Sequence, residues 1–301
     1  MIEPTLNYLP CPDASGGHNM AYWQWGDGQS SHVVVCVHGL SRQGRDFDVL
    51  ARALVGRSNG SLQVVCPDVA GRGRSDWLKD ANAYQFPTYV ADMSCLLSHL
   101  HERSAIKTLD WVGTSMGGLI GLGLCGHPEL PLPAPVRRLV LNDVGPVVQW
   151  ASLVRIGQYL GQTGHFQSLQ QAADAMWADS SSFGPLSAQQ WLELSAAMVR
   201  PHPDGGLTLH YDPAIAVPVR GLTPEGVASG EQALWQLYDA VSARTLLLRG
   251  KASDLLTSQT ADEMTRRGPK ARLVEFAGVG HAPMLVAEDQ VNAVVRFIMD
   301  V

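Results

Sequence analysis

Residues 111–118 read Trp111-Val-Gly-Thr-Ser115-Met-Gly-Gly118, an apolar run that ends in the pattern Gly-x-Ser-x-Gly. A segment of small residues, 119–126, follows and can pack closely as a helix, so Ser115 falls at a predicted turn from strand to helix. Glycines at 113 and 117 leave room for the chain to double back, which holds the serine hydroxyl clear of a sheet. The pattern indicates a candidate nucleophile, although glycine-bracketed serines also occur in ordinary turns.

Length and composition indicate one enzyme-sized unit. The chain has 301 residues, 46% of them apolar, which is enough for one large α/β domain with an insertion or for two small domains. The formal charge is −6 and there is no basic block, so we expect neither a nucleic-acid nor a membrane partner. The N-terminus lacks a signal-peptide pattern, and no apolar stretch approaches the roughly 20 residues that span a bilayer. We expect a cytoplasmic protein, either a monomer or a homodimer.

The five cysteines show no Cys-x-x-Cys spacing, which predicts neither a zinc site nor a disulfide framework. Several of them lie in or beside apolar runs, where a reduced thiol behaves as a small hydrophobic side chain. The sequence also contains neither a His-Glu-x-x-His motif nor a dinucleotide-binding fingerprint. We therefore expect no metal and no cofactor.

Strand-like and helical segments alternate along most of the chain. The β-branched run 32–37 predicts a buried central strand. Further strands are predicted at 7–9, 21–25, 62–66, 109–112, 136–141, 245–248 and 273–276, and helices at 46–55 and 88–103. Strand–helix–strand repeats with short connections predict a mostly parallel sheet with helices on both faces.

One long segment, 145–240, breaks this alternation because it is helical and loop-rich. A connection of this length between strands is usually functional. We expect a mainly helical cap over 145–240, inserted into a core made of 1–144 and 241–301. Trp150 and Trp177 are candidate substrate-binding residues of the cap, although aromatic side chains at helical spacing more often pack within a core.

Three further motifs accompany Ser115. They are His38-Gly39-Leu40 after the strand at 32–37, Pro67-Asp-Val-Ala-Gly-Arg-Gly-Arg-Ser75 after the next strand, and Gly278-Val-Gly-His281 near the C-terminus. Together with Ser115, in this order along the chain, they resemble the α/β-hydrolase family. The resemblance implies an α/β-hydrolase fold: a mostly parallel sheet with helices on both faces and an inserted helical cap.

The resemblance also implies catalytic roles. Ser115 corresponds to the nucleophile, His281 to its base, and the backbone N–H groups of Leu40 and Met116 to the oxyanion hole. A serine hydroxyl is a poor nucleophile at neutral pH and needs a base within hydrogen-bond reach. His38 is expected to support the oxyanion loop instead.

Two aspartates remain open as the acid of the triad. Asp254 follows the strand after the cap, which is the usual family position, and we favour it. Asp143 follows the preceding strand and is the alternative, with a cap-hinge or loop-fixing role otherwise.

These roles imply a serine hydrolase of the carboxylesterase type. We expect it to cleave small to medium acyl or aromatic esters through a Ser-His-Asp triad and an acyl-enzyme intermediate, with a small-molecule ester as its partner. Lactonases and C–C bond hydrolases of the same fold stay open, as does a ligand-binding homologue with little turnover. A C–C hydrolase needs a cation for the substrate carboxylate, and Arg42 or Arg45 is a candidate unless both are solvated loop residues.

Overall fold

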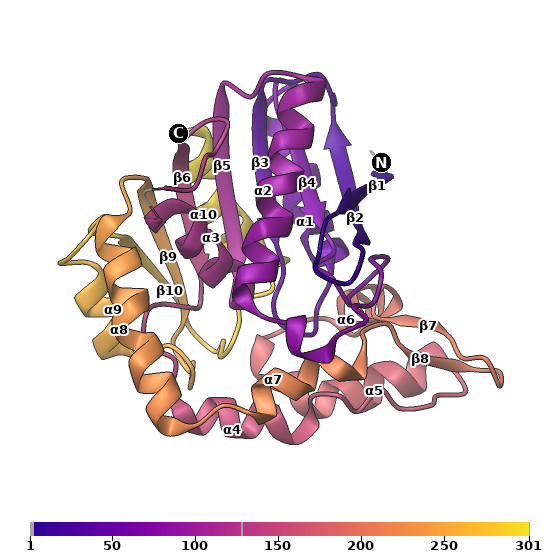
Figure 1. Ribbon diagram of the computed structural model, residues 1–301. Coiled ribbons are helices and arrows are strands. Elements are labelled where there is room, and N and C mark those ends of the chain that lie inside the picture. The colour runs from indigo at the N-terminus through magenta and orange to yellow at the C-terminus, as the bar shows by residue number, and fades with distance from the viewer. Residues whose placement is uncertain (1–2, 128, 301) are drawn as a thin grey trace.

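The computed structural model describes residues 3–127 and 129–300, and its centre is an eight-stranded sheet (Figure 1). The strand order is β1-β2-β4-β3-β5-β6-β9-β10. The strands are β1 (Thr5–Cys11), β2 (His18–Gly26), β3 (His32–Val37), β4 (Gln63–Pro67), β5 (Thr108–Thr114), β6 (Val136–Asn142), β9 (Arg244–Gly250) and β10 (Arg272–Phe276). The pairs β1–β2 and β2–β4 are antiparallel and all the others are parallel. The predicted fold class is therefore confirmed.

Helices cover both faces of this sheet. One face carries α2 (Phe86–Arg103), α3 (Met116–Gly126) and α8 (Pro224–Ala240), and the other carries α1 (Asp48–Arg57) and α10 (Glu288–Met299). The remaining helix of this layer, α9 (Ser258–Met264), contacts α8 through a hydrogen bond from the Tyr238 hydroxyl to the carbonyl oxygen of Met264 (2.5 Å).

The central strand β3 shows why both faces need a helical cover. Val33, Val35 and Val37 pack with the core on the side of α2 and α3, whereas Val34 and Cys36 pack with the core on the side of α1 and α10. Side chains alternate between the two faces of a strand, so an unbroken apolar run is stable only where both faces are buried. This is the physical basis of the strand predicted at 32–37.

The segment between β6 and β9 forms a layer beneath the sheet, at the edge where the parallel strands end (Figure 1). It contains α4 (Trp150–Tyr159), α5 (Leu169–Ser180), α6 (Ala188–Ala196), the hairpin β7 (Val199–Pro201) and β8 (Leu207–Leu209), α7 (Ala216–Arg220) and α8. Four short 3₁₀ helices complete the described chain: η1 (Gly44–Phe47), η2 (Ala81–Ala83), η3 (Ser181–Phe183) and η4 (Pro213–Ile215).

The last helix of the inserted segment, α8, returns to the core. A Cβ on Gly126 of α3 would collide with the backbone of Leu237 in α8, so the two helices are in close backbone contact. The boundaries 145–240 stay a prediction for the cap, with α8 packed on the helical layer of the sheet.

The longest helices of the described residues are not membrane spans. None of them combines the length and the apolar character that crossing a bilayer requires.

Candidate active site

Ser115 occupies a sharp turn between β5 and α3. Its backbone has φ 51° and ψ −117°, a conformation that L-residues rarely adopt. The turn needs glycines on either side: a Cβ at Gly113 would collide with the backbone of Gly117, and one at Gly117 would collide with the carbonyl of Val37. The geometry thus explains the Gly-x-Ser-x-Gly pattern sterically, and it lifts the serine hydroxyl above the end of the sheet.

A chain of hydrogen bonds links Ser115, His281 and Asp143. The Ser115 hydroxyl lies 2.9 Å from Nε2 of His281, and Nδ1 of the same ring lies 2.8 Å from Oδ2 of Asp143. Because a carboxylate accepts at Nδ1, that nitrogen carries the ring proton. Nε2 is then free to accept the proton of the serine hydroxyl.

The carboxylate of Asp143 is fully buried and its position is fixed by two other donors. Oδ1 accepts a hydrogen bond from the backbone N–H of Gly250 (2.9 Å), and Oδ2 accepts one from the hydroxyl of Ser253 (2.6 Å). Ser253 therefore joins the loop after β9 to the residue after β6. Sequence reasoning gave Ser253 no role.

Asp254 does not occupy the position for which it was favoured. Its carboxylate is half exposed and pairs with Arg155 of α4, at 2.7 Å from Nη2 and 3.0 Å from Nε. Its carbonyl oxygen accepts a hydrogen bond from Ser152 of the same helix (2.8 Å). The loop after β9 turns Asp254 toward the inserted segment, so the expected contact with His281 is wrong and the alternative, Asp143, makes it.

The backbone N–H groups of Leu40 and Met116 have no hydrogen-bond acceptor within the described part of the chain. For Met116 this follows from its place at the start of α3, where the first N–H groups have no partner inside the helix. Leu40 lines the same cavity as Ser115. Both amides are thus unpaired donors next to the serine.

His38 holds the backbone ahead of Leu40. Its Nδ1 donates to the carbonyl of Gly39 (2.7 Å), and its Nε2 accepts from the N–H of Val69 (2.9 Å). Burial without a carboxylate partner lowers the pKa of His38 to about 3, so the ring is neutral. Its contacts are those of a residue that fixes a loop.

Arg72, which sequence reasoning passed over, also supports Leu40. It is fully buried, its Nε donates to the carbonyl of Leu40 (2.8 Å) and its Nη1 donates to the hydroxyl of Tyr89 (3.0 Å). Nη2 lies 3.9 Å from the sulfur of Met116. The one sequence signal for this residue was its position between two glycines of the motif that ends at Ser75.

A cavity of about 350 Å³ opens above Ser115 and His281, between the sheet and the inserted segment. Of the three substrate-binding candidates, Arg42 lines it, but its guanidinium makes a bidentate ion pair with Asp46 (2.7 Å to each oxygen). Trp150 does not line the cavity and is 37% exposed on α4. Trp177 does not line it either, because its ring packs against Trp191 with ring centroids 5.1 Å apart.

Other side chains of the inserted segment form the apolar wall of the cavity. They are Ile156, Tyr159, Leu160, Phe166, Met176, Phe183, Met198 and Tyr211. Such a lining suits a ligand with an apolar body. Composition showed that the segment is rich in aromatic residues, but the choice of these residues depends on how each helix is rotated.

The match with a family model decides the family: residues 34–294 fit the model described as "Alpha/beta hydrolase family". The chain belongs to the alpha/beta hydrolase family. The matched range includes Leu40, Ser115, Asp143 and His281. This alpha/beta hydrolase is accordingly an enzyme.

Two curated relatives of this alpha/beta hydrolase match along nearly the whole chain. A protein of Cupriavidus necator named 3-hydroxybutyrate-oligomer hydrolase is 46% identical over 298 residues, which are 98% of either chain. The esterase Rv0045c of Mycobacterium tuberculosis is 26% identical over 297 residues, 92% of this chain and 84% of the relative.

Solved structures show the same architecture. An alpha/beta hydrolase from Novosphingobium aromaticivorans superposes with a TM-score of 0.83 at 33% identity, covering 100% of both chains. The structure of a "putative hydrolase" from Rickettsia typhi superposes with a TM-score of 0.84 at 25% identity over 99% of both chains.

The described residues contain one cluster of side chains suited to a metal ion, Cys11, His18 and Asp92. It lies on β1, β2 and α2, whereas Ser115 lies after β5. None of the three lines the cavity above the serine.

Proposed function

We propose that this alpha/beta hydrolase is a serine ester hydrolase that cleaves short oligomers of 3-hydroxyalkanoic acids, such as 3-hydroxybutyrate. The hydrogen-bonded series Asp143–His281–Ser115 at the floor of a cavity carries the proposal. The substrate class comes from the relative of 46% identity, whose name describes a hydrolase of 3-hydroxybutyrate oligomers. Such oligomers are esters with small aliphatic units, which suits the apolar wall of the cavity.

In the proposed first half-reaction, Nε2 of His281 takes the proton of Ser115 while the serine oxygen attacks the ester carbonyl. Asp143 accepts a hydrogen bond from the Nδ1–H of His281 and stabilises the imidazolium that forms. The N–H groups of Leu40 and Met116 donate to the oxyanion, a contribution of about 3–4 kcal/mol for one such donor. When the C–O bond breaks, His281 protonates the leaving oxygen, and the shorter oligomer leaves with a free hydroxyl end.

The second half-reaction repeats these roles with water. His281 removes a proton from water as its oxygen attacks the acyl-serine carbonyl, and the same two amides stabilise the oxyanion. Collapse of this intermediate breaks the bond to Ser115, which regains its proton from His281. The second product carries a free carboxyl group, so each cycle consumes one water molecule.

The C–C bond hydrolase alternative needs an available cation, and the bidentate contact of Arg42 with Asp46 weighs against Arg42 in that role. Arg45 pairs with Asp48 in the same way (2.6 and 2.7 Å).

The five cysteines are free, in line with the reducing cytoplasm that we propose as the site of action.

The test compares 3-hydroxybutyrate dimer and trimer with p-nitrophenyl esters from acetate to laurate, with wild-type protein and Ser115→Ala. We expect the dimer and trimer to be cleaved to monomer, and no cleavage by Ser115→Ala. If p-nitrophenyl esters are hydrolysed and neither oligomer is cleaved, the proposed substrate class is wrong, but the assignment as an ester hydrolase stands. No turnover of any ester by folded wild-type protein would contradict the proposed function as a whole.

A further inference from the structure

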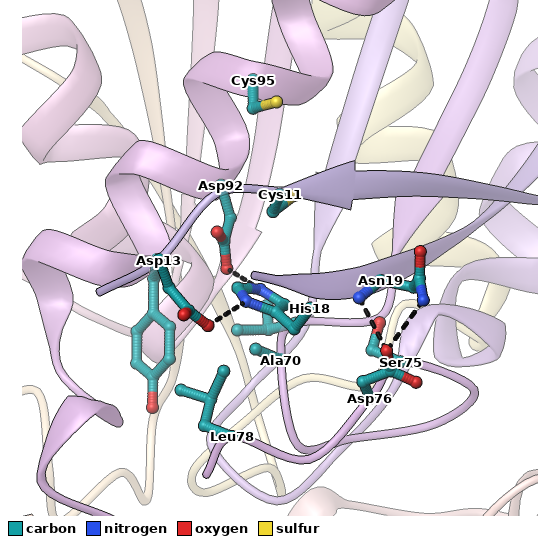
Figure 2. A network of polar contacts seen from close by, with 12 residues as sticks. Cys11, Asp13, His18, Asn19, Ala70, Ser75, Asp76, Leu78, Asp92 and Cys95 are labelled. Carbon is teal, nitrogen blue, oxygen red and sulfur yellow. Dashed lines mark hydrogen bonds and ion pairs between the residues drawn. The ribbon is translucent and has the colours of Figure 1, made fainter. Parts of the chain in front are cut away.

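The edge hairpin of the sheet meets α2 at three buried side chains (Figure 2). Cys11 ends β1, His18 begins β2, and Asp92 lies on α2. Their donor atoms are a sulfur, a ring nitrogen and a carboxylate oxygen, and all lie within 4.8 Å of one another. Three different kinds of metal-ligating atom thus face one another in the interior.

His18 lies between two carboxylates, as the dashed lines in Figure 2 show. Its Nδ1 is 3.0 Å from Oδ2 of Asp13, and its Nε2 is 3.1 Å from Oδ2 of Asp92. A neutral imidazole has only one N–H. The second contact therefore needs either a further proton, carried by the ring or by the carboxyl group, or a metal ion.

The turn between β1 and β2 stabilises the ionised carboxylate of Asp13, which favours a ring proton on Nδ1 of His18. Oδ1 of Asp13 accepts from the N–H of Ser15 (2.7 Å), the hydroxyl of Ser15 (2.9 Å) and the N–H of Gly17 (2.9 Å). These donors hold the carboxylate in place and favour its ionised form. With the ring proton on Nδ1, His18 donates to Asp13, and the lone pair of Nε2 faces Asp92, where a metal ion can bind. A carboxylate behind the distal nitrogen is also how metal-binding histidines are usually oriented.

Protein cations do not fill the gap. In the described part of the chain, Asp13 and Asp92 form ion pairs with His18 and with no lysine or arginine. The thiol of Cys11 completes a sulfur, nitrogen and oxygen donor set. Zn²⁺ accepts all three atom types, whereas Ca²⁺ and Mg²⁺ prefer oxygen alone.

The spacing of these donors suits a small tetrahedral site. Bonds of about 2.0–2.3 Å place neighbouring ligands roughly 3.5 Å apart. The 3.1 Å between His18 and Asp92 is close to this value, and the limit of 4.8 Å for the whole set requires only a small side-chain movement. A water molecule completes the four ligands of such a site, as in many zinc proteins.

We propose that Cys11, His18 and Asp92 bind one Zn²⁺ ion, with Asp13 orienting His18. On binding, the thiol of Cys11 gives its proton to solvent, and the ion takes the place of any proton between Nε2 and Asp92. The ion then fastens the edge strands β1 and β2 to α2. Because it binds the folded arrangement, it stabilises the fold without taking part in ester hydrolysis.

The test starts from metal-stripped, reduced protein and uses ZnCl₂ alone as the probe. Native mass spectrometry in a His281→Ala background, which removes the histidine nearest Ser115 as a competing ligand, is expected to show one tightly bound ion. Zn²⁺ is expected to raise the melting temperature of wild-type protein and leave its ester hydrolysis unchanged. CoCl₂ is expected to give a thiolate-to-cobalt absorption band that requires Cys11.

Variants then assign the ligands. Cys11→Ser and Asp92→Asn are expected to weaken binding at least about tenfold, and Asp13→Asn about tenfold through the orientation of His18. Cys125→Ser in α3 is the matched cysteine control and is expected to bind like wild type. Circular dichroism checks that each variant is folded.

Three results would overturn the proposal. The first is the absence of stoichiometric Zn²⁺ binding by folded wild-type protein at micromolar metal. The second is binding to Cys11→Ser and Asp92→Asn that equals wild type. The third is a Cys11–Cys95 disulfide in protein purified under reducing conditions. Mass spectrometry would show it as an intact mass lower by two hydrogen atoms. The wild-type titration decides the question even if a variant does not fold.

Discussion

Asp143 and His281 are 138 residues apart in the chain, yet the Asp143 carboxylate lies 2.8 Å from Nδ1 of the histidine. Asp143 follows β6 and His281 follows β10, and the parallel strands bring both residues to one edge of the sheet. The carboxylate is buried, so it faces the imidazole without competition from water.

Asp143→Asn is expected to lower kcat for ester hydrolysis by about 10⁴-fold, because the amide no longer favours the ring proton on Nδ1. The matched variant Asp254→Asn is expected to stay within about twofold of wild type, since its half-exposed pair with Arg155 is worth at most about 1 kcal/mol. Steady-state kinetics on p-nitrophenyl butyrate measures both. A larger loss in Asp254→Asn than in Asp143→Asn would contradict the assignment.

Ser253→Ala removes the hydroxyl that donates to Asp143 at 2.6 Å. Hydrogen bonds to charged groups are worth about 1.5–3 kcal/mol, so we expect kcat to fall about tenfold or more while KM stays unchanged. Ser253→Thr keeps the hydroxyl and is expected to recover most of the loss. The control is Ser258→Ala at the start of α9; an equal loss there would show that Ser253 has no positioning role.

Arg72→Met removes the donor to the Leu40 carbonyl. The part-buried carbonyl then lacks its partner, at a cost of about 1 kcal/mol in the free energy of unfolding. We expect kcat to fall by roughly 10–100-fold because the Leu40 amide loses its orientation. Arg74→Met, two residues along and exposed, is the control. Chemical denaturation and kinetics of both variants separate stability from positioning, and unchanged kcat in Arg72→Met would rule the positioning out.

His38 makes stability depend on pH. Burial lowers its pKa to about 3 in the folded protein, against about 6.5 in an unfolded chain. Between pH 6.5 and pH 3 the unfolded state therefore binds a proton at His38 that the folded state does not bind. The free energy of unfolding falls as the pH decreases below 6.5. Between pH 6.5 and pH 4.5 this loss is about 2 kcal/mol for His38 alone.

Two other buried groups act over a similar range. Burial lowers the pKa of His210, which adds to the loss, whereas burial raises the pKa of Asp68 to about 6, so its protonation in the folded state works in the opposite direction. Both groups are present in wild type and in His38→Gln, so comparison of the two proteins cancels the contributions of His210 and Asp68. We expect urea denaturation to show a loss of stability between pH 6.5 and pH 4.5 that is about 2 kcal/mol smaller in His38→Gln than in wild type. Exposed His127→Gln should match wild type, and an equal loss in all three proteins would refute the role of His38.

Local sequence patterns predicted the strands of the eight-stranded sheet and the turn at Ser115, whereas the hairpin β7–β8 was not predicted. Each depends on a few neighbouring residues: the apolar run at 32–37 requires two covered faces, and Gly113 and Gly117 are the residues that the turn tolerates. Such constraints act over short distances along the chain. They are therefore visible before the fold is known.

Contacts between distant elements could not be predicted in this way. Asp143 and Asp254 both follow strands that end near His281, and only the path of the loop after β9 decides which one reaches it. Trp150 and Trp177 lie on helices whose rotation is set by packing. The composition of the inserted segment therefore could not show that these two side chains lie outside the cavity.

The proposed zinc ligands show the same limit. His18 and Asp92 are 74 residues apart, and no spacing rule for metal sites joins them. Their proximity arises because α2 packs across the end of the edge hairpin.

The loop after β9 places two consecutive residues on different partners. Ser253 holds the carboxylate of Asp143, while Asp254 holds α4 through Arg155 and Ser152. Only one peptide unit therefore separates the residue that contacts α4 from the residue that supports the carboxylate. The loop after β9 thus joins a helix that lines the cavity to the carboxylate that orients His281.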